Sequence, residues 1–350
     1  MTTVQKCPLY RLNSTSRGNG DFNTIPAGIN YGDFLYWNGS EWKTDSNKVH
    51  LGANAGRYNQ GLYAIALGQA AGTNYQSTNA ISIGYASGNY YQGQNAIAIG
   101  QNAGINLQGE NAISIGQNAG NQNQGQNAIA IGYATGAEYQ GPNAIAIGQN
   151  VGANTQGTSS IAIGQNAGSY FQGEYSIAIG QNVGIVNQGN NSIIIGQNAE
   201  STGNESIVLN SSSLNQVNAT TSGLFINPIR GPFSSSNVLS YNTTTKEIFY
   251  NGSSKRYKHD IESLTNNTEN LYKLEPREFK YNINGEEDIG LIAEEADKCD
   301  PWFAYKDNDG IPEGIQWNSI TTYLIAEMKK MKEDIEGCEK EIEALKKIIK

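Results

Sequence analysis

A serine and a lysine five residues apart are the side chains of this sequence best suited to covalent chemistry. They are Ser253 and Lys258, in the stretch NGSSKRYKHD at 251–260. Cleavage of a peptide bond by a side chain needs an activated nucleophile, a base and a site for the oxyanion. A lysine amine acts as a base only when deprotonated, and burial or nearby positive charge favours that state. Lys255 and Arg256 supply such charge, so Ser253 is a candidate nucleophile and Lys258 a candidate base. From the residues alone, a solvated basic turn or a phosphate contact is the alternative.

Gly252 precedes the serine, and its peptide bond is the one that we expect to be cut. Glycine leaves room for the attacking group and tolerates a strained backbone. An extended strand would place Ser253 and Lys258 on opposite faces, and a helix would separate them by about 140°. Either the segment bends sharply, or the lysine of one chain meets the serine of another. His259 offers an alternative, a triad, which ranks below the Ser–Lys dyad.

The residues around this serine resemble a known family. Ser253, Arg256 and Lys258 fit the pattern S-[SD]-x-R-x-K at the start of the endosialidase-type C-terminal intramolecular chaperone. That family comprises self-cleaving serine peptidases of phage tail spikes and large-virus fibres. Its second segment, G-x-I-A-Q-E, is similar to residues 290–295, where Glu294 replaces the usual glutamine. The resemblance covers about residues 253–335 and implies a trimer whose C-terminal domain directs assembly and is then released.

Charge changes at the same place in the chain. Residues 1–252 carry ten acidic and eight basic residues, which leaves 22 and 15 of the totals of 32 and 23 for residues 253–350. A length of 350 residues predicts two or three domains. Neither part has the basic excess of a nucleic-acid binder, and no apolar run is long enough to span a membrane. The first 16 residues lack the apolar core of a signal peptide, so we expect synthesis in the host cytoplasm.

Glycines recur every 16 residues from Gly52 to Gly196. The consensus NAIAIGQNAGxxxQGx is matched at every fixed position by residues 95–110. This period suits one turn of a parallel β-solenoid, which we expect over residues 51–210. Residues 52–200 contain no aspartate and four glutamates, too few hard ligands for calcium. We expect no metal and no cofactor. Three distant cysteines also argue against a disulfide framework.

Each repeat contains a strand in which large and small side chains alternate. Successive side chains of a strand point to opposite faces, so Ile97 and Ile99 lie on one face and Ala96 and Ala98 on the other. We expect the isoleucines to form the inner ladder. The small residues would then form a flat outer wall against which identical chains pack. One glutamine per repeat, from Gln60 to Gln188, would form a stacked amide ladder.

The I-A-I-G strand followed by Ala-Gly resembles the YadA-like head repeats of trimeric adhesins, which implies a trimer here. The common repeat of that family is shorter, so the x-x-x-Gln-Gly segment is interpreted as an enlarged turn. This turn carries exposed-type aromatics such as Tyr90, Tyr91, Tyr170 and Phe171. Aromatic rings on a rigid scaffold can stack on sugars, so we hypothesise binding to a host cell-surface glycan. Tolerated loop decoration is the alternative.

The flanking segments complete the expected architecture. Residues 1–50 are interpreted as a β-rich cap or attachment region, with a hairpin turning at Asn38-Gly39. Residues 211–252 are interpreted as a β-neck with an edge strand at 224–230 and a hairpin at 238–250. Residues 253–350 form a small α/β chaperone. Its last part, 317–350, has apolar residues three and four apart and predicts a coiled coil.

The sequence therefore predicts a mainly β homotrimer: a viral fibre or tail-spike-like protein on the virion surface. It would cleave itself once between Gly252 and Ser253. The alternative is a structural trimeric adhesin that is not cleaved and keeps a permanent coiled-coil foot. Bacterial relatives of the solenoid need a signal peptide and a membrane anchor, and neither is found here. A membrane-released transcription factor is disfavoured because a basic DNA-binding domain and a transmembrane helix are lacking.

Overall fold

The computed structural model describes residues 28–213, 216–229, 239–242, 245–250, 252–265, 267–307 and 309–349. Expectations for residues 1–27 lie outside this range. The chain divides into two compact units, Met1–Gly231 and Pro232–Lys350, which are treated separately. No helix of the described part is long and apolar enough to cross a membrane.

The first unit begins with the predicted hairpin. Strands β1 (Phe34–Trp37) and β2 (Trp42–Asp45) pair antiparallel with Trp37 opposite Trp42. This register leaves four residues in the loop, so the expected two-residue Asn-Gly turn is wrong. The Asn38 carboxamide oxygen accepts hydrogen bonds from the backbone N–H groups of Ser40 at 2.8 Å and Glu41 at 2.9 Å. That side chain closes the longer loop in the manner of an Asx turn.

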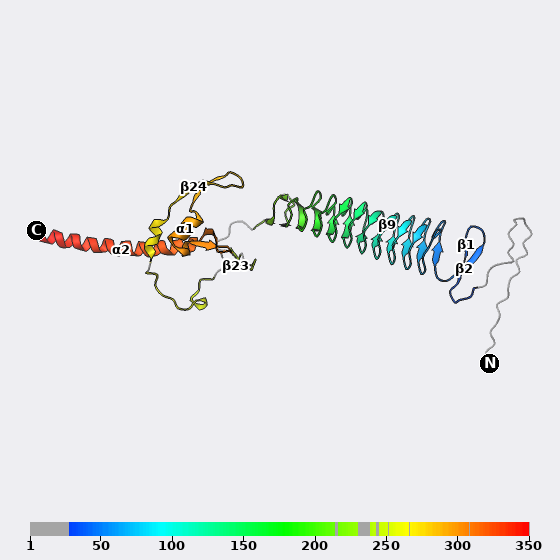
Figure 1. Cartoon of the computed structure of the whole chain (residues 1–350), viewed down its shortest axis with the longest axis horizontal. Coiled ribbons are helices and arrows are strands. Elements are labelled where there is room, and N and C mark those ends of the chain that lie inside the picture. Colours follow the sequence, from blue (N-terminus) through cyan, green and yellow to red (C-terminus); the bar gives the residue numbers. More distant parts are fainter. Residues whose placement is uncertain are drawn as a thin grey trace, which may run out of the picture. The chain divides into compact units, whose positions relative to one another are not determined.

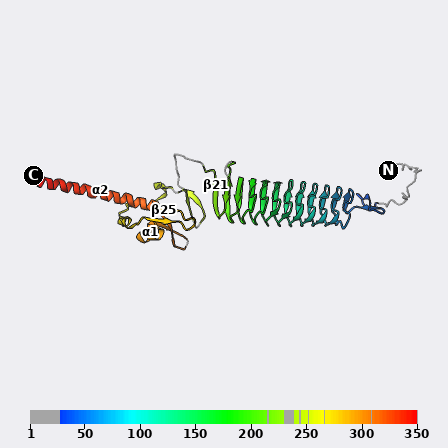
Figure 2. The same ribbon diagram turned by 90° about the horizontal axis from the view of Figure 1, so that it is seen from above.

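The repeats form the predicted parallel β-solenoid (Figures 1 and 2). Its larger sheet has 13 strands in the described part. They are β3 (Val49–Leu51), β4 (Ile65–Leu67), β6 (Ile81–Ile83), β8 (Ile97–Ile99), β10 (Ile113–Ile115), β12 (Ile129–Ile131), β14 (Ile145–Gln149), β16 (Ile161–Gln165), β17 (Ile177–Val183), β18 (Ile193–Ser201), β19 (Ser206–Asn210), β20 (Val217–Ala219) and β21 (Gly223–Asn227). The pairing of Ile97 with Ile113, and of Ile113 with Ile129, reproduces the 16-residue period.

A smaller sheet of six described strands forms a second wall of the coils. Its members are β5 (Asn74–Gln76), β7 (Tyr90–Gln92), β9 (Asn106–Gln108), β11 (Gln122–Gln124), β13 (Tyr139–Gln140) and β15 (Thr155–Gln156). Sharp turns join the two sheets. At Gly100, φ is +127°, and an added Cβ would lie 2.6 Å from the carbonyl oxygen of Gly116 in the next coil. Only glycine permits this turn and this stacking distance.

The expectation about which strand face lies inside is wrong. Ala98 and Ala130 are fully buried within the coil, whereas Ile115 and Ile147 are 37% and 36% exposed. At the position of Ala98 the interior is narrow, because a Cβ on Gly104 in the facing turn would lie 3.2 Å from the Ala98 Cβ. The small residues therefore form the core and the larger ones point outward. The outward residues, here called the isoleucine face, include Ile97, Ile99, Ile113, Ile115, Ile129, Ile131, Ile145, Ile147, Ile161 and Ile163.

The glutamine ladder is present and is buried. Gln124 donates from Nε2 to the carbonyl oxygen of Ile113 at 2.8 Å, and so connects the two sheets across the coil. The same amide bonds Gln140 Oε1 at 3.1 Å, and Gln108 bonds Gln124 in the same way. These amides thus find partners within their own coil and in the next one, as a buried polar group requires. Gln172 and Gln188 keep the bond across the coil but, within the described part of the chain, make no bond to a neighbouring glutamine.

The last coils depart from the period. Strand β18 pairs with β19, where Ile193 lies opposite Ile207, and β19 pairs with β21 at the edge of the sheet. Residues 217–227, expected in a separate neck, therefore continue the solenoid sheet. Ile194 and Val208 occupy the inner positions here and are fully buried. An apolar core takes the place of the glutamine ladder, whose last member is Gln188.

The second unit combines short strands with two helices. Hairpin β22 (Leu239–Tyr241) and β23 (Ile248–Tyr250) is antiparallel, as predicted. Two further hairpins follow, β24 (Arg277–Lys280) with β25 (Glu287–Gly290) and β26 (Ala304–Lys306) with β27 (Pro312–Ile315). Helices are α1 (Ala293–Cys299) and α2 (Trp317–Ile348), and the 3₁₀ turns are η2 (Lys255–Tyr257), η3 (Thr268–Lys273) and η4 (Pro301–Phe303). The core consists of Ala296, Phe303, Ile320 and Tyr323.

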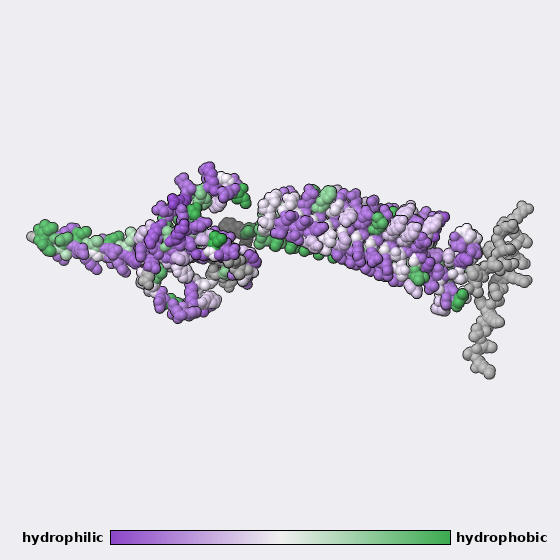
Figure 3. Space-filling view, viewed as in Figure 1, coloured by the Kyte–Doolittle hydropathy of each residue, from purple (hydrophilic) through white to green (hydrophobic). Residues whose placement is uncertain are grey.

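Helix α2 is long and carries an apolar stripe. The stripe side chains Leu324, Met328, Met331, Ile335, Ile342 and Leu345 are all exposed in the single chain. Apolar side chains also gather at the C-terminal end of the helix (Figure 3). The helix itself is as predicted. Its pairing into a coiled coil stays a prediction.

Candidate functional site

One turn of 3₁₀ helix shapes the segment that carries Ser253 and Lys258. Ser254 precedes η2 with extended backbone, and its hydroxyl accepts a hydrogen bond from the backbone N–H of Arg256. The N–H of Lys258 then bonds the carbonyl oxygen of Lys255 at 3.1 Å, and Lys258 returns to extended backbone. Serine is a favoured residue at this capping position, because its oxygen satisfies an N–H that the turn leaves free.

This turn brings the predicted nucleophile and base together within one chain. Lys258 Nζ donates to Ser253 Oγ at 2.8 Å. The sharp bend considered for this segment is therefore observed, and it brings the two side chains into contact within the single chain. Both side chains are exposed in the single chain.

Gly252 and Arg256 pack against the ring of Tyr257. A Cβ on Gly252 would lie 3.0 Å from that ring, closer than nearly all ordinary contacts, so a side chain here would push the ring away. On the other side of the turn, the Arg256 guanidinium carbon lies 4.7 Å from the centre of the same ring. Arg256 thus braces the turn by a cation–π contact. Lys255 is exposed on the turn.

His259 turns to its neighbour and not to the serine. His259 Nδ1 lies 2.8 Å from Asp260 Oδ2, and both side chains are about nine-tenths exposed. In the part of the chain that the structure describes, the side-chain hydrogen bond of Ser253 is with Lys258. The geometry favours the dyad over the triad.

Ser253 opens onto a groove of about 980 Å³. Gly252, Ser253 and Lys258 line one part of it, and Leu264, Trp302 and the first turns of α2, including Tyr323, line the rest. Trp302 is 70% exposed. The groove therefore combines the candidate dyad with apolar rings and with hydroxyl groups of α2.

A buried aspartate positions two of these rings, and sequence reasoning missed it. Asp300 accepts hydrogen bonds from Tyr323 Oη at 3.2 Å, from Asn270 Nδ2 at 3.0 Å and from the backbone N–H of Trp302 at 3.0 Å. It links η3, η4 and α2 beneath the groove. The Asp-Pro pair at 300–301 was an available signal, because aspartate before a proline marks the start of a helical turn.

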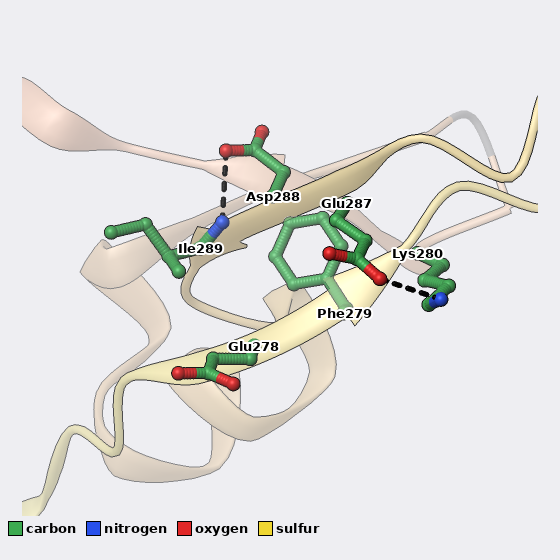
Figure 4. A pocket seen from close by; sticks show the side chains of 6 residues that line it. All are labelled: Glu278, Phe279, Lys280, Glu287, Asp288 and Ile289. Carbon is green, nitrogen blue, oxygen red and sulfur yellow. Dashed lines mark hydrogen bonds and ion pairs between the residues drawn. The ribbon is translucent and has the colours of Figure 1, made fainter.

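The segment 290–295 has a structural role in this unit. Arg277 on β24 donates from Nε to Glu295 on α1 at 2.9 Å. The adjacent hollow on the β24–β25 hairpin is shown in Figure 4, where Lys280 and Glu287 turn toward each other at 2.6 Å. Its lining is a surface ion pair with exposed carboxylates. Glu294 lies in the first turn of α1.

The four aromatics proposed for glycan binding lie on the solenoid of the first unit, whereas Ser253 and Lys258 belong to the second unit. Tyr90, Tyr91, Tyr170 and Phe171 are each about half exposed. They occupy two adjacent positions of the repeat, in coils that are five repeats apart. Among the described residues, no three histidine, cysteine, aspartate or glutamate side chains group as a metal site.

Comparison with protein families supports both resemblances noted in the sequence. Residues 253–313 match the family described as chaperone of endosialidase. Residues 92–104, 124–150, 151–167 and 156–182 match the YadA head domain repeat. Neither the curated proteins nor the solved structures gave a match. The C-terminal match begins at Ser253, the residue that Lys258 contacts.

Proposed function

We propose that this protein is a homotrimeric fibre or spike for attachment to a host, carried on a virion surface. Its solenoid serves as the shaft, and residues 253–350 serve as an intramolecular chaperone that cuts itself free. The observation that carries the proposal is the 2.8 Å contact between Lys258 Nζ and Ser253 Oγ at the first residue of the chaperone match.

The proposed cleavage has two steps. Lys258 takes the hydroxyl proton as Ser253 Oγ attacks the Gly252 carbonyl carbon. The C–N bond to Ser253 breaks, its nitrogen receives the proton back, and Gly252 becomes esterified to Ser253 Oγ. Water then hydrolyses the ester. The products are residues 1–252 and 253–350, and Lys258 ends in its starting state.

Trimer assembly supplies what the single chain lacks at this site. The lysine amine must lose its proton, and burial favours the neutral form. Lys258 is exposed in one chain, so a neighbouring chain that covers it would switch the base on. Two apolar surfaces support association, the isoleucine face and the stripe on α2. Cleavage would then follow correct assembly.

Intact-mass spectrometry of the purified protein tests the cleavage. The parent chain should give two species that meet between Gly252 and Ser253. Ser253→Ala and Lys258→Ala should each leave one full-length chain, still trimeric in light scattering. The control His259→Ala should be processed normally. If the dyad acts within one chain, trimers that mix the Ser253→Ala and Lys258→Ala chains should stay uncut, whereas a dyad shared between chains would give partial cleavage. Processing of the Ser253→Ala chain at Gly252 would disprove the mechanism.

A second candidate is the uncleaved trimeric adhesin with a permanent coiled-coil foot. The exposure of both dyad side chains in the single chain favours it, because peptide cleavage needs a site that excludes water around the nucleophile and base. A single full-length mass for the parent trimer would select this candidate.

A further inference from the structure

A second groove lies on the solenoid, at the corner after the six-stranded sheet. Its volume is about 430 Å³, and it crosses four successive coils between Asn59 and Glu110. Neighbouring coils are about 4.8 Å apart, so three steps make a length of roughly 14 Å. Gly61 and Gly93 are among the residues that line it, and their backbone N–H groups are bonded to the next coil. These two N–H groups are therefore not available to a ligand.

An aromatic ring forms part of its lining. Tyr75 lines the groove and is 49% exposed. The ring of Tyr91 in the next coil stacks on it, with 5.0 Å between centres and 2° between planes. Asn59, one coil earlier at the same position, also lines the groove. One face of Tyr75 is thus covered by Tyr91, while the small side chain of Asn59 leaves the other face accessible.

The backbone at these tyrosines is strained. Tyr75 and Tyr91 have φ angles of +58° and +56°, the left-handed region that disfavours bulky residues. Asn59, Asn123 and Asn187 occupy the equivalent position in other coils with the residue type that tolerates it best. Leu107 and Phe171 adopt the same conformation at the equivalent position of other coils, with φ angles of +53° and +57°. The positive φ is therefore a property of this position of the repeat, and what distinguishes the groove is the exposed, stacked pair of aromatic rings.

Polar side chains along the groove are free to bind. Within the described residues, Asn59, Thr78, Gln94 and Glu110 have no side-chain hydrogen bond to protein. The adjacent position of the repeat behaves differently. There Asn79, Asn95, Asn111, Asn127 and Asn143 bond one another from coil to coil at 3.0–3.2 Å. The groove thus has unused donors and acceptors next to an aromatic ring.

We propose that this groove binds a neutral, linear oligosaccharide that runs along the solenoid axis. A pyranose offers an apolar face to Tyr75 and hydroxyl groups to Gln94 and Glu110. The only charge on the lining is the Glu110 carboxylate, which disfavours anionic sugars. The coil spacing is similar to the length of one sugar unit, so successive units meet successive coils. This site deepens the attachment role proposed above and rests on it.

Glycan arrays with the intact trimer test the site. The arrays carry neutral and anionic oligosaccharides of graded length, and calorimetry then measures the affinity of each glycan bound. Tyr75→Asn removes the ring but installs the residue that other coils carry, so the coil should fold. Gln94→Ala removes a side chain without a protein partner. Tyr133→Ser is the control, an exposed tyrosine at another corner of the coil. A double variant, Tyr170→Ser with Phe171→Ser, tests the other aromatics.

We expect a neutral glycan whose affinity falls about tenfold or more in Tyr75→Asn and Gln94→Ala but not in Tyr133→Ser. If glycan binding is lost only in the Tyr170→Ser and Phe171→Ser double variant, the proposed attachment function stands but the groove is not the binding site. Binding of anionic glycans only, or of none, would also overturn it. Light scattering and intact mass on the same samples report assembly and cleavage separately, so failure of the groove is distinguishable from failure of the fibre.

Discussion

Glu327 is a buried carboxyl group at which η3 is attached to α2. Its side chain is only 8% exposed and lies 3.1 Å from Lys330 Nζ. Hydrogen bonds from Thr268, Lys330 and Tyr272 hold its pKa below the usual value, with Thr268 the largest cause. Lys330 also donates to Thr268. The cluster therefore fixes η3, whose residue Asn270 in turn holds Asp300 beneath the dyad groove.

A pH dependence follows from this cluster. Because the folded pKa of Glu327 is lowered, its stabilising contribution is present above the ordinary value of about 4.5 and is lost as the pH falls through the folded value. The melting temperature of the second unit should fall as the pH is lowered through that range. Glu327→Gln should flatten the dependence, whereas the exposed control Glu339→Gln should not. Parallel curves for parent and Glu327→Gln would contradict the assignment.

At the scale of elements, the solenoid strands and hairpins were predictable but the buried face was not. Alternation in I-A-I-G defines two faces, and the larger side chains are usually inside. Here the distance between the two walls of the coil determines which face of the strand is buried. That distance depends on the glycine turns and on the glutamine ladder. The Ser253–Lys258 contact shows a similar limit. The residue types indicated a Ser–Lys pair, but only the turn capped by Ser254 shows that the two side chains come within hydrogen-bond distance in one chain.

The inverted faces give opposite expectations for two substitutions. Ala130→Ile places extra carbons in the narrow interior, so the coil should be destabilised by about 1–3 kcal/mol or more. Ile115→Asn lies on the isoleucine face, so the coil should stay folded while the trimer weakens. Chemical denaturation and light scattering separate the two effects. A stable trimer with Ala130→Ile and an unfolded coil with Ile115→Asn would instead indicate that the isoleucines lie inside the coil and the small residues outside.

At the scale of the molecule, the two units are stabilised differently. The solenoid repeats the same contacts between neighbours, so its stability is approximately a sum over coils. The second unit has one small core around Phe303, and much of α2 lies outside that core. We infer that the shaft can persist alone once assembled, whereas the C-terminal unit depends on its partners.

Deleting one coil tests this additivity. Removal of residues 111–126 joins Glu110 to Asn127 and keeps every ladder in register. The shortened protein should fold, form trimers and melt within a few degrees of the parent. Removal of residues 111–118 only, half a coil, should disrupt the sheet and the glutamine ladder. Circular dichroism melting and light scattering compare the two. Equal damage from both deletions would argue against independent coils.

The glutamine ladder has a consequence for how the number of coils can change during evolution. Since Gln108, Gln124 and Gln140 make equivalent bonds, a coil can be gained or lost without a change elsewhere in the protein. Near-identical repeats in a gene recombine out of alignment, and each such event would alter the shaft by a whole coil. Lineages could therefore differ in fibre length while keeping the same C-terminal unit. The exposed turns of a duplicated coil would then be free to diverge in sequence.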